Sequence, residues 1–308
     1  MHLVNESLRR RGGIHRLRGM DSHLAISFTW IRVKGKDSAD FLGRLSTTDM
    51  RKMPSPSAAR TLFLTGTSLV IAPAHLLRLS SEEFFLISED AAAMARLEAH
   101  LEAMHFSEAL EREVGISAGA FLFSVDQIDV GRSLKGAAGE TIFFPMEIVE
   151  GALVWEMGLS GFGLRMSLPP SGGADLFSRQ NETGFYESMR IAAKIPRFER
   201  EWREGSRALD VGFLPWIQRT KGCYPGQEVV EKSLNLGHPA KALVRVRKLG
   251  GGSEKIPLPL TVERDGAGAG ELTSLSPEGL GLAVVKWDSR VPGTRLIAPG
   301  FEFIVEGD

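Results

Sequence analysis

Hydrophobic and polar positions along the chain predict an α+β fold, in which strand and helix patterns are mixed rather than strictly alternating. The run 25–33 is rich in β-branched and aromatic residues, which is typical of a strand. Asp37 and Asp40 then resemble the start of a capping box, and the apolar face of a short helix follows at 41–45. We expect the polar turn 46–49 to end this helix.

Short apolar runs separated by turn residues predict a group of strands followed by an amphipathic helix. Gly66-Thr67 separates two such runs and favours a hairpin. After a helix-start signal at 88–90, apolar residues recur at helical spacing from Met94 to Met104 and are interpreted as core. Glycines between 158 and 163 are interpreted as breaks. The predicted strands are 61–64, 68–71, 75–79, 84–87, 121–125, 140–149 and 153–157, and further helices are predicted at 5–10, 175–179 and 184–193.

From residue 241 the chain changes to short segments of strand composition separated by turns. Turn signals occur at Asp265-Gly266, at 276–279 and at 291–293. About five strands in about 70 residues predict a small antiparallel barrel or sandwich. The predicted domains are therefore 1–239 and 240–308.

Composition and charge narrow the classes of partner. With 308 residues and 33.6 kDa, the chain is long enough for two cores. Its formal net charge of −1 gives no general attraction to nucleic acid or to anionic membranes. The single cysteine excludes an internal disulfide, and no apolar run is long enough to span a bilayer. We expect a cytoplasmic protein, although the arginine-rich stretch 1–20 leaves open a transit segment or an exposed basic helix.

The only cysteine, Cys223, lies between glycines in the stretch 221–228, Lys-Gly-Cys-Tyr-Pro-Gly-Gln-Glu. A free cysteine is often a buried and inert apolar residue. Here Lys221, and a helix expected to have Pro225 in its first turn, would both favour the thiolate. The residues therefore leave two interpretations open, a core residue or a functional thiol. No histidine has a spacing that suggests a Cys–His pair, so a protease-like nucleophile is not predicted.

Other candidate sites have simpler interpretations. The seven histidines include no pair with metal-ligand spacing on one helix face, so no metal site is predicted. The glycine-rich run 266–270 lacks the spacing and the following helix of a dinucleotide fingerprint, and a hairpin turn is predicted instead. From their surroundings alone, Asp49 is interpreted as a turn cap and Arg190 as a solvated helix arginine.

The stretch 221–228 resembles the signature of the YgfZ-type proteins, folate-binding relatives of the glycine-cleavage T-protein (aminomethyltransferase). That signature is Lys-Gly-Cys-Tyr/Phe-x-Gly-Gln-Glu, and every specified position matches. Weaker similarity is found at 35–37, 41–42, 48–49, 189–191, 195–196 and 279–283. The resemblance implies two intertwined α+β subdomains followed by a small β-barrel, arranged as a ring whose central channel takes tetrahydrofolate.

The sequence departs from the family pattern in two places. T-proteins that transfer an aminomethyl carbon have a glutamate two residues after the arginine that corresponds to Arg190, where it can pair with the pterin ring. This chain has Ala192 there, as YgfZ-type members also lack the acid, and a methyl group offers no acceptor. Lys232 and Lys241 occupy positions where the family tends to have arginines, which keeps the charge but not the bidentate geometry.

The resemblance implies a tetrahydrofolate-binding protein that supports assembly or repair of iron–sulfur clusters. Cys223 would be the essential thiol, and Lys221 would favour its thiolate. The implied folate-binding residues are Gly222, Tyr224, Gly226, Gln227, Glu228, Arg190 and Asp49. The implied partners are a folate and iron–sulfur client proteins. Two alternatives stay open: a transferase that moves a one-carbon unit to tetrahydrofolate, and a folate-binding module without catalysis.

Overall fold

The computed structural model describes residues 22–123, 143–144, 146–149, 152–159, 162–167, 183–235, 237–250 and 256–307. These residues form two compact units. Unit 1 comprises the described residues within Met1–Phe63, Ile71–Glu182 and Trp216–Tyr224, and unit 2 comprises those within Leu64–Val70, Thr183–Pro215 and Pro225–Asp308. Both units are built from separate stretches of chain, and one boundary falls inside the cysteine stretch. The domain division at residue 239 stays a prediction.

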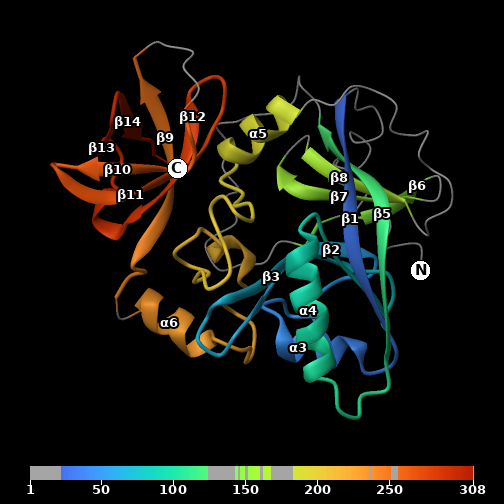
Figure 1. Ribbon diagram of the computed structural model, residues 1–308. Coiled ribbons are helices and arrows are strands. Elements are labelled where there is room, and N and C mark those ends of the chain that lie inside the picture. The colour runs from blue at the N-terminus through green and yellow to red at the C-terminus, as the bar shows by residue number, and fades with distance from the viewer. Residues whose placement is uncertain are drawn as a thin grey trace. The chain divides into compact units, whose positions relative to one another are not determined.

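Unit 1 is built around an eight-stranded sheet in the order β2-β3-β4-β1-β5-β8-β7-β6. Its longest pairing is antiparallel and joins β1 to β5 from Ser22↔Phe123 to Lys34↔Glu111 (Figure 1). Ile31 and Val33 of β1 are fully buried, as the apolar run predicted. The strands are β1 Ser22–Lys34, β2 Ser57–Leu64, β3 Val70–Arg78, β4 Glu83–Ser88, β5 Glu111–Phe123, β6 Met146–Val149, β7 Ala152–Leu159 and β8 Phe162–Ser167.

Helix α4 (Ala91–Ala103) packs against β1 and β4, and its pattern was predicted correctly over most of its length. The Asp90 side chain caps it by accepting a hydrogen bond from the Ala93 N–H at 2.9 Å. The residues Met94, Leu97 and Leu101 are buried. Met104 lies just beyond the helix and is exposed, so the predicted apolar stripe is one position too long.

Helix α3 (Ser38–Leu45) buries Phe41, Leu42 and Leu45 as predicted, but its start differs from the prediction. The Asp37 side chain makes no capping hydrogen bond to this helix. Its Oδ2 instead accepts from the Ala109 N–H at 2.7 Å. The predicted capping box is therefore wrong, because a residue distant in sequence supplies the donor.

Unit 2 contains a closed six-stranded barrel in the order β10-β11-β12-β9-β14-β13, coloured orange to red in Figure 1. The pairing of Glu263 in β10 with Ile297 in β13 closes the barrel, which leaves no free edge. Six strands replace the five or so that were predicted, and the predicted turns at 265–266, 276–279 and 291–293 all lie between strands. The strands are β9 Lys241–Leu249, β10 Leu260–Arg264, β11 Ala267–Leu275, β12 Leu280–Lys286, β13 Arg295–Ala298 and β14 Phe301–Val305.

The remaining helices of unit 2 flank the barrel in sequence. Helix α5 (Thr183–Ala192) packs against β11 and β12, close to the predicted helix 184–193. Helix α6 (Gln227–Asn235) begins two residues after Pro225, which therefore precedes the helix instead of lying in its first turn. Short 3₁₀ turns are η3 (Leu214–Trp216) in the segment before the cysteine and η4 (Trp287–Ser289) after β12. In the described part of the chain, no helix is long and apolar enough to cross a membrane.

Several strand predictions were wrong because pairing partners override local pattern. The predicted runs 68–71 and 75–79 belong largely to the single strand β3. Strand β5 begins ten residues before the predicted 121–125, since its charged first residues pair with β1. Strand β8 was missed because its glycine was interpreted as a break. The predictions at 5–10, 124–125, 140–142 and 175–179 lie outside the described residues.

Candidate functional site

The lysine of the cysteine stretch anchors it to the end of a helix in unit 1. The buried Lys221 ammonium donates hydrogen bonds to the carbonyl oxygens of Gly43 and Ser46. These carbonyls belong to the last turn and the C-cap of α3, where helical carbonyls lack partners and a positive charge is favourable. The ring of Tyr224, which is also buried, has its centroid 5.6 Å from the ammonium nitrogen. Lys221 therefore holds the start of the stretch in place.

Burial also changes the acidity of this lysine. The pKa of Lys221 falls from 10.5 to about 8, chiefly because burial disfavours the charged form. The charge of Asp49 and that of Cys223 act in the opposite direction, whereas Arg51 lowers the pKa further. A lysine with this pKa can exchange a proton near neutral pH.

This lowered pKa predicts a pH-dependent contribution to stability. Between pH 8 and pH 10.5 the unfolded chain binds more protons at Lys221 than the folded chain, so its contribution to the unfolding free energy rises with pH. At about 1.4 kcal/mol per pKa unit, the rise is at most about 3 kcal/mol. We expect the difference in unfolding free energy between wild type and Lys221→Met to grow by up to that amount across this range. Urea denaturation at several pH values measures it, with the exposed Lys52→Met as control; parallel curves for wild type and Lys221→Met would contradict the assignment.

Asp49 is buried and holds the turn that faces the segment before the cysteine. Its N–H donates to Gln218 Oε1 at 2.7 Å, and the Gln218 N–H donates to the Thr47 carbonyl at 3.1 Å. The Asp49 Oδ1 atom accepts from the Arg51 N–H at 3.2 Å, which is the predicted turn-capping role. The Lys52 ammonium lies 3.6 Å from the other carboxylate oxygen. The sequence pattern gave no sign of Gln218, whose side-chain amide becomes significant only through this contact.

Cys223 is exposed, so the interpretation as a core residue is wrong. The neighbouring Gly222 is exposed too, and a Cβ built there would meet only the Arg51 Nη2 atom, at 4.0 Å. The thiol therefore stands on an open turn within unit 1, next to a buried cation. Among the residues that the structure describes, no group of three or more His, Cys, Asp or Glu side chains could hold a metal ion.

The second half of the stretch belongs to unit 2 and is fixed by packing. Gly226 has φ of +82°, and its carbonyl oxygen accepts the first helical hydrogen bond of α6, from the Val230 N–H at 3.1 Å. A Cβ at this position would lie 2.6 Å from the Thr65 carbonyl oxygen. Gln227 is partly buried and Glu228 is exposed in the first turn of α6, where a negative charge is favourable. Within the described ranges, neither side chain makes a hydrogen bond or an ion pair.

Replacing Gly226 by alanine should destabilise unit 2 through both strain and contact. The positive φ costs an alanine about 1–2 kcal/mol, and the Thr65 carbonyl must move as well, so we expect a total loss above about 2 kcal/mol. Gly205→Ala is the matched control, because Gly205 has φ of +81° and nothing within 4 Å of the new Cβ. Thermal unfolding of both variants separates the cost of the positive φ from the cost of the contact with the Thr65 carbonyl. Equal losses would show that the close approach at Gly226 contributes nothing.

Arg190 in α5 is fully buried, so its interpretation as a solvated arginine is wrong. Its Nη1 donates to Glu201 Oε2 at 2.8 Å and to the Ile195 carbonyl at 2.9 Å. Its Nη2 donates to Ser274 Oγ at 2.7 Å and to Glu187 Oε2 at 2.8 Å, and Nε also faces that Glu187 oxygen. A folate contact by Arg190 stays a prediction, and it would compete with these protein acceptors.

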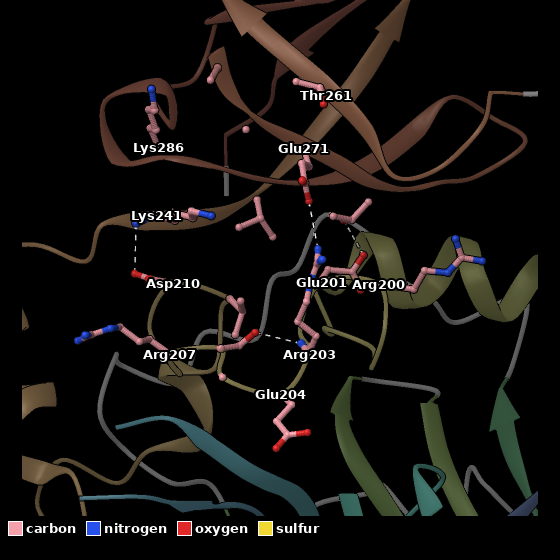
Figure 2. A pocket seen from close by; sticks show the side chains of 17 residues that line it. Arg200, Glu201, Arg203, Glu204, Arg207, Asp210, Lys241, Thr261, Glu271 and Lys286 are labelled. Carbon is pink, nitrogen blue, oxygen red and sulfur yellow. Dashed lines mark hydrogen bonds and ion pairs between the residues drawn. The ribbon is translucent and has the colours of Figure 1, made fainter. Parts of the chain in front are cut away.

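Glu201 joins this arginine to the barrel and lies at the edge of a cavity of about 580 Å³ in unit 2. Its Oε1 accepts from Thr273 Oγ1 at 2.9 Å and from Ser274 Oγ at 2.6 Å, both in β11. The cavity is bounded by the segment 200–211 and by barrel strands, with an ion pair of 3.2 Å between Arg203 and Glu271 (Figure 2). No sequence pattern indicated this cavity, because its walls come from segments far apart in the chain.

Lys241 begins the first barrel strand and lines the same cavity. Figure 2 shows its side chain extending toward the middle of the cavity, while its backbone N–H donates to Asp210 Oδ1 at 3.2 Å. Within the described residues, its ammonium has no hydrogen-bond or ion-pair partner. Lys232, the other lysine at a family arginine position, lies exposed in the last turn of α6 in the same unit.

Comparison with known proteins agrees with the resemblance of the cysteine stretch. No protein-family model matches the chain. A chloroplastic protein of Arabidopsis thaliana, named as a candidate transferase, is 24% identical over 226 residues, which cover 67% of this chain and 51% of the relative. The mitochondrial iron–sulfur cluster assembly factor IBA57 of Homo sapiens is 26% identical over 238 residues, which cover 72% of this chain and 64% of the relative. The chain thus spans about half of the first of these relatives and 64% of the second.

Among solved structures, the fold is similar to that of the glycine cleavage system aminomethyltransferase T from Bartonella henselae. The TM-score is 0.73 at 17% sequence identity, over 96% of this chain and 88% of that one. This confirms the predicted α+β fold with a C-terminal antiparallel barrel. Together with the complete match at 221–228, the relatives and the fold support a YgfZ-type protein related to aminomethyltransferase T.

Proposed function

We propose that the protein binds tetrahydrofolate or a derivative and supports assembly or repair of iron–sulfur clusters in client proteins, with Cys223 as the essential thiol. The observation that carries the proposal is the exposed thiol of Cys223 on the turn held by Lys221. A relative named as an iron–sulfur cluster assembly factor supports the cluster role. The aminomethyltransferase fold supports a folate-related function.

The chemistry proposed for Cys223 requires a thiolate that a partner can reach. A thiolate binds iron directly and attacks disulfides, so it can hold a cluster transiently or exchange with a client disulfide, forming a mixed disulfide and releasing one client thiolate. One protein thiolate supplies only one of the ligands that a cluster needs, and the client or a carrier supplies the others. Lys221, with a pKa of about 8, can keep a positive charge beside the thiol or accept its proton. Cys223 and Lys221 would therefore act together in forming the reactive thiolate.

The folate site is proposed around the turn that faces Cys223 in unit 1. The exposed backbone at Gly222 allows close approach of a ligand, and the Asp49 carboxylate can accept hydrogen bonds from the N–H groups of a pterin. Tyr224 contributes a buried ring next to Lys221. Of the other predicted ligand residues, Gly226 and Arg190 have packing and hydrogen-bonding roles within unit 2, and Gln227 and Glu228 remain available for a ligand or a partner.

Calorimetric titration with tetrahydrofolate tests this proposal. We expect saturable binding by wild type and by Cys223→Ala, because the thiol is assigned to cluster chemistry and not to folate recognition. Wild type should also restore the activity of iron–sulfur enzymes in cells that lack the protein. Absence of folate binding by the wild type would remove the folate part of the proposal, and failure to restore those activities would remove the cluster part.

A one-carbon transferase is the second candidate function, and the fold similarity to an aminomethyltransferase favours it. At the position of the missing glutamate, Ala192 ends α5, and its carbonyl oxygen accepts from Arg245 Nη1 at 3.1 Å. Its side chain offers no acceptor to a pterin. We therefore expect no methylene-tetrahydrofolate when purified protein is incubated with tetrahydrofolate and an aminomethyl donor. Turnover in that assay would favour the transferase over the cluster role.

The cytoplasmic location stays a prediction. The two curated relatives are named as chloroplastic and mitochondrial. The arginine-rich stretch 1–20, for which a transit segment was left open, lies outside the described residues.

A further inference from the structure

Arg60 in β2 is a buried cation without a counter-ion. Only 6% of its surface is exposed. Within the ranges that the structure describes, its guanidinium makes no hydrogen bond or ion pair, and its Nε atom is both sealed from solvent and unpaired. Burial lowers the pKa of Arg60 to about 10, so the side chain stays charged at neutral pH. Buried charges in proteins are normally paired, and this one is not.

Aromatic rings surround this charge without neutralising it. The Arg60 Cζ atom lies 5.4 Å from the ring centroid of Trp216 and 5.6 Å from that of Phe144. The His75 ring lies 5.9 Å from that of Trp216 and 6.0 Å from that of Trp155. Burial, together with the charge of Arg60, lowers the pKa of His75 to about 3, so this ring is neutral. The cluster, which we call the Arg60 cluster, therefore carries one net positive charge.

A second hydrogen-bond donor in the cluster also lacks an acceptor. Trp155 is fully buried, and within the described part of the chain its indole N–H has no partner. Arg60 lies beside Trp216, and Trp155 lies beside His75, which itself neighbours Trp216. A negatively charged acceptor would satisfy both unpaired donors and neutralise the charge. His75 is partly buried, whereas the Trp155 and Trp216 rings beside it are buried.

The Arg60 cluster is connected to the candidate thiol site within unit 1. Trp216 begins the segment 216–224 that carries Cys223. Its carbonyl oxygen accepts a hydrogen bond from Thr47 Oγ1 at 2.7 Å, in the same turn that holds Asp49. A ligand bound at the cluster would therefore lie against the segment that also positions the thiol.

We propose that Arg60 and Trp155 bind the carboxylate of an aromatic ligand, whose ring packs against Trp216 and His75. This inference rests on the proposed folate function, because a folate carries its carboxylates on the glutamate that is attached to its p-aminobenzoyl ring. It assigns recognition of that half of the ligand to Arg60, a residue outside the cysteine stretch. The pterin half has no carboxylate and would bind independently of Arg60.

Three probes separate binding of the carboxylate-bearing half of a folate from binding of the pterin half. They are benzoate, p-aminobenzoyl-L-glutamate and 6-methyltetrahydropterin. Binding to the full-length protein is followed by calorimetry and by tryptophan fluorescence, since Trp155 and Trp216 lie in the cluster. For Arg60→Met we expect at least about tenfold weaker binding of the two carboxylates, an intermediate loss for Arg60→Lys, and unchanged pterin binding. The melting temperature of ligand-free Arg60→Met should stay the same or rise, because a buried charge without a counter-ion is removed. Arg44→Met, at an exposed arginine of α3, is the matched control in unit 1.

The outcomes distinguish this inference from the proposed function. If tetrahydrofolate binds wild type and Arg60→Met equally well, the inference is wrong while the folate function stands. If tetrahydrofolate does not bind but benzoate binds in an Arg60-dependent way, the carboxylate site stands without the folate function. If Arg60→Met lowers the melting temperature by several degrees and weakens all three probes alike, Arg60 is a structural residue and the inference is overturned.

Discussion

Replacing Cys223 by serine should reduce the activity of iron–sulfur enzymes in cells to the level seen without the protein. A serine hydroxyl is not ionised near neutral pH and neither binds iron as a thiolate does nor exchanges with disulfides. Because Cys223 is exposed and has no packing role, the melting temperature of the purified variant should stay within about 1 °C of wild type, as surface substitutions normally leave it. Loss of function with an intact fold is the expected signature of a chemical role.

The measurement is complementation of a strain lacking the protein, read out as activity of several iron–sulfur enzymes, with matched expression levels. Thr220→Ala is a suitable control, since Thr220 is an exposed neighbour without an assigned role. Tetrahydrofolate binding should be retained by both variants. If Cys223→Ser restores client activities as well as wild type does, the thiol is not essential and the proposed chemistry is wrong.

Removing either member of the Arg190–Glu201 pair should cost about 3–5 kcal/mol of unfolding free energy, the largest loss of stability that we expect in unit 2. Both side chains are fully buried, and their nitrogen and oxygen atoms lie 2.8 Å apart. Arg190→Met leaves the Glu201 carboxylate without its cation, and Glu201→Leu leaves the Arg190 guanidinium with one carboxylate fewer. In Arg190→Met the cause is a buried carboxylate without its cation, and in Glu201→Leu it is a buried guanidinium that keeps only Glu187 as a counter-ion.

A double-mutant cycle measured by urea denaturation separates this cause from lost packing. The double variant Arg190→Met/Glu201→Leu should lose less than the sum of the two single variants, because neither the Glu201 carboxylate nor the Arg190 guanidinium then remains buried without the other. Arg203→Met is the control for an exposed pair, since Arg203 bonds Glu271 at the rim of the cavity, and it should cost at most about 1 kcal/mol. Additive losses in the cycle would show that the two residues do not act as a pair.

The local pattern of the chain determined much of its secondary structure. Helix α4, its Asp90 cap and its buried face follow from apolar spacing and one acidic residue, both readable without tertiary contacts. The barrel was predicted from turn residues that recur at regular intervals. Tight turns favour residues such as glycine, proline and aspartate for local backbone reasons, so they can be recognised without tertiary contacts. Strand ends were predicted poorly: the charged beginning of β5 is a strand only because β1 supplies its partners.

The sequence by itself also singled out the cysteine stretch, since a signature of adjacent residues is local information. Only the tertiary structure decided what the candidate residues, inside and outside this stretch, contact. Lys221 caps α3, and Arg190 is a buried partner of Glu201 rather than a solvated arginine. Arg60 emerged as an unpaired charge only once residues distant in sequence were seen around it. Burial and electrostatic pairing depend on neighbours distant along the chain, so no pattern of adjacent residues could reveal them.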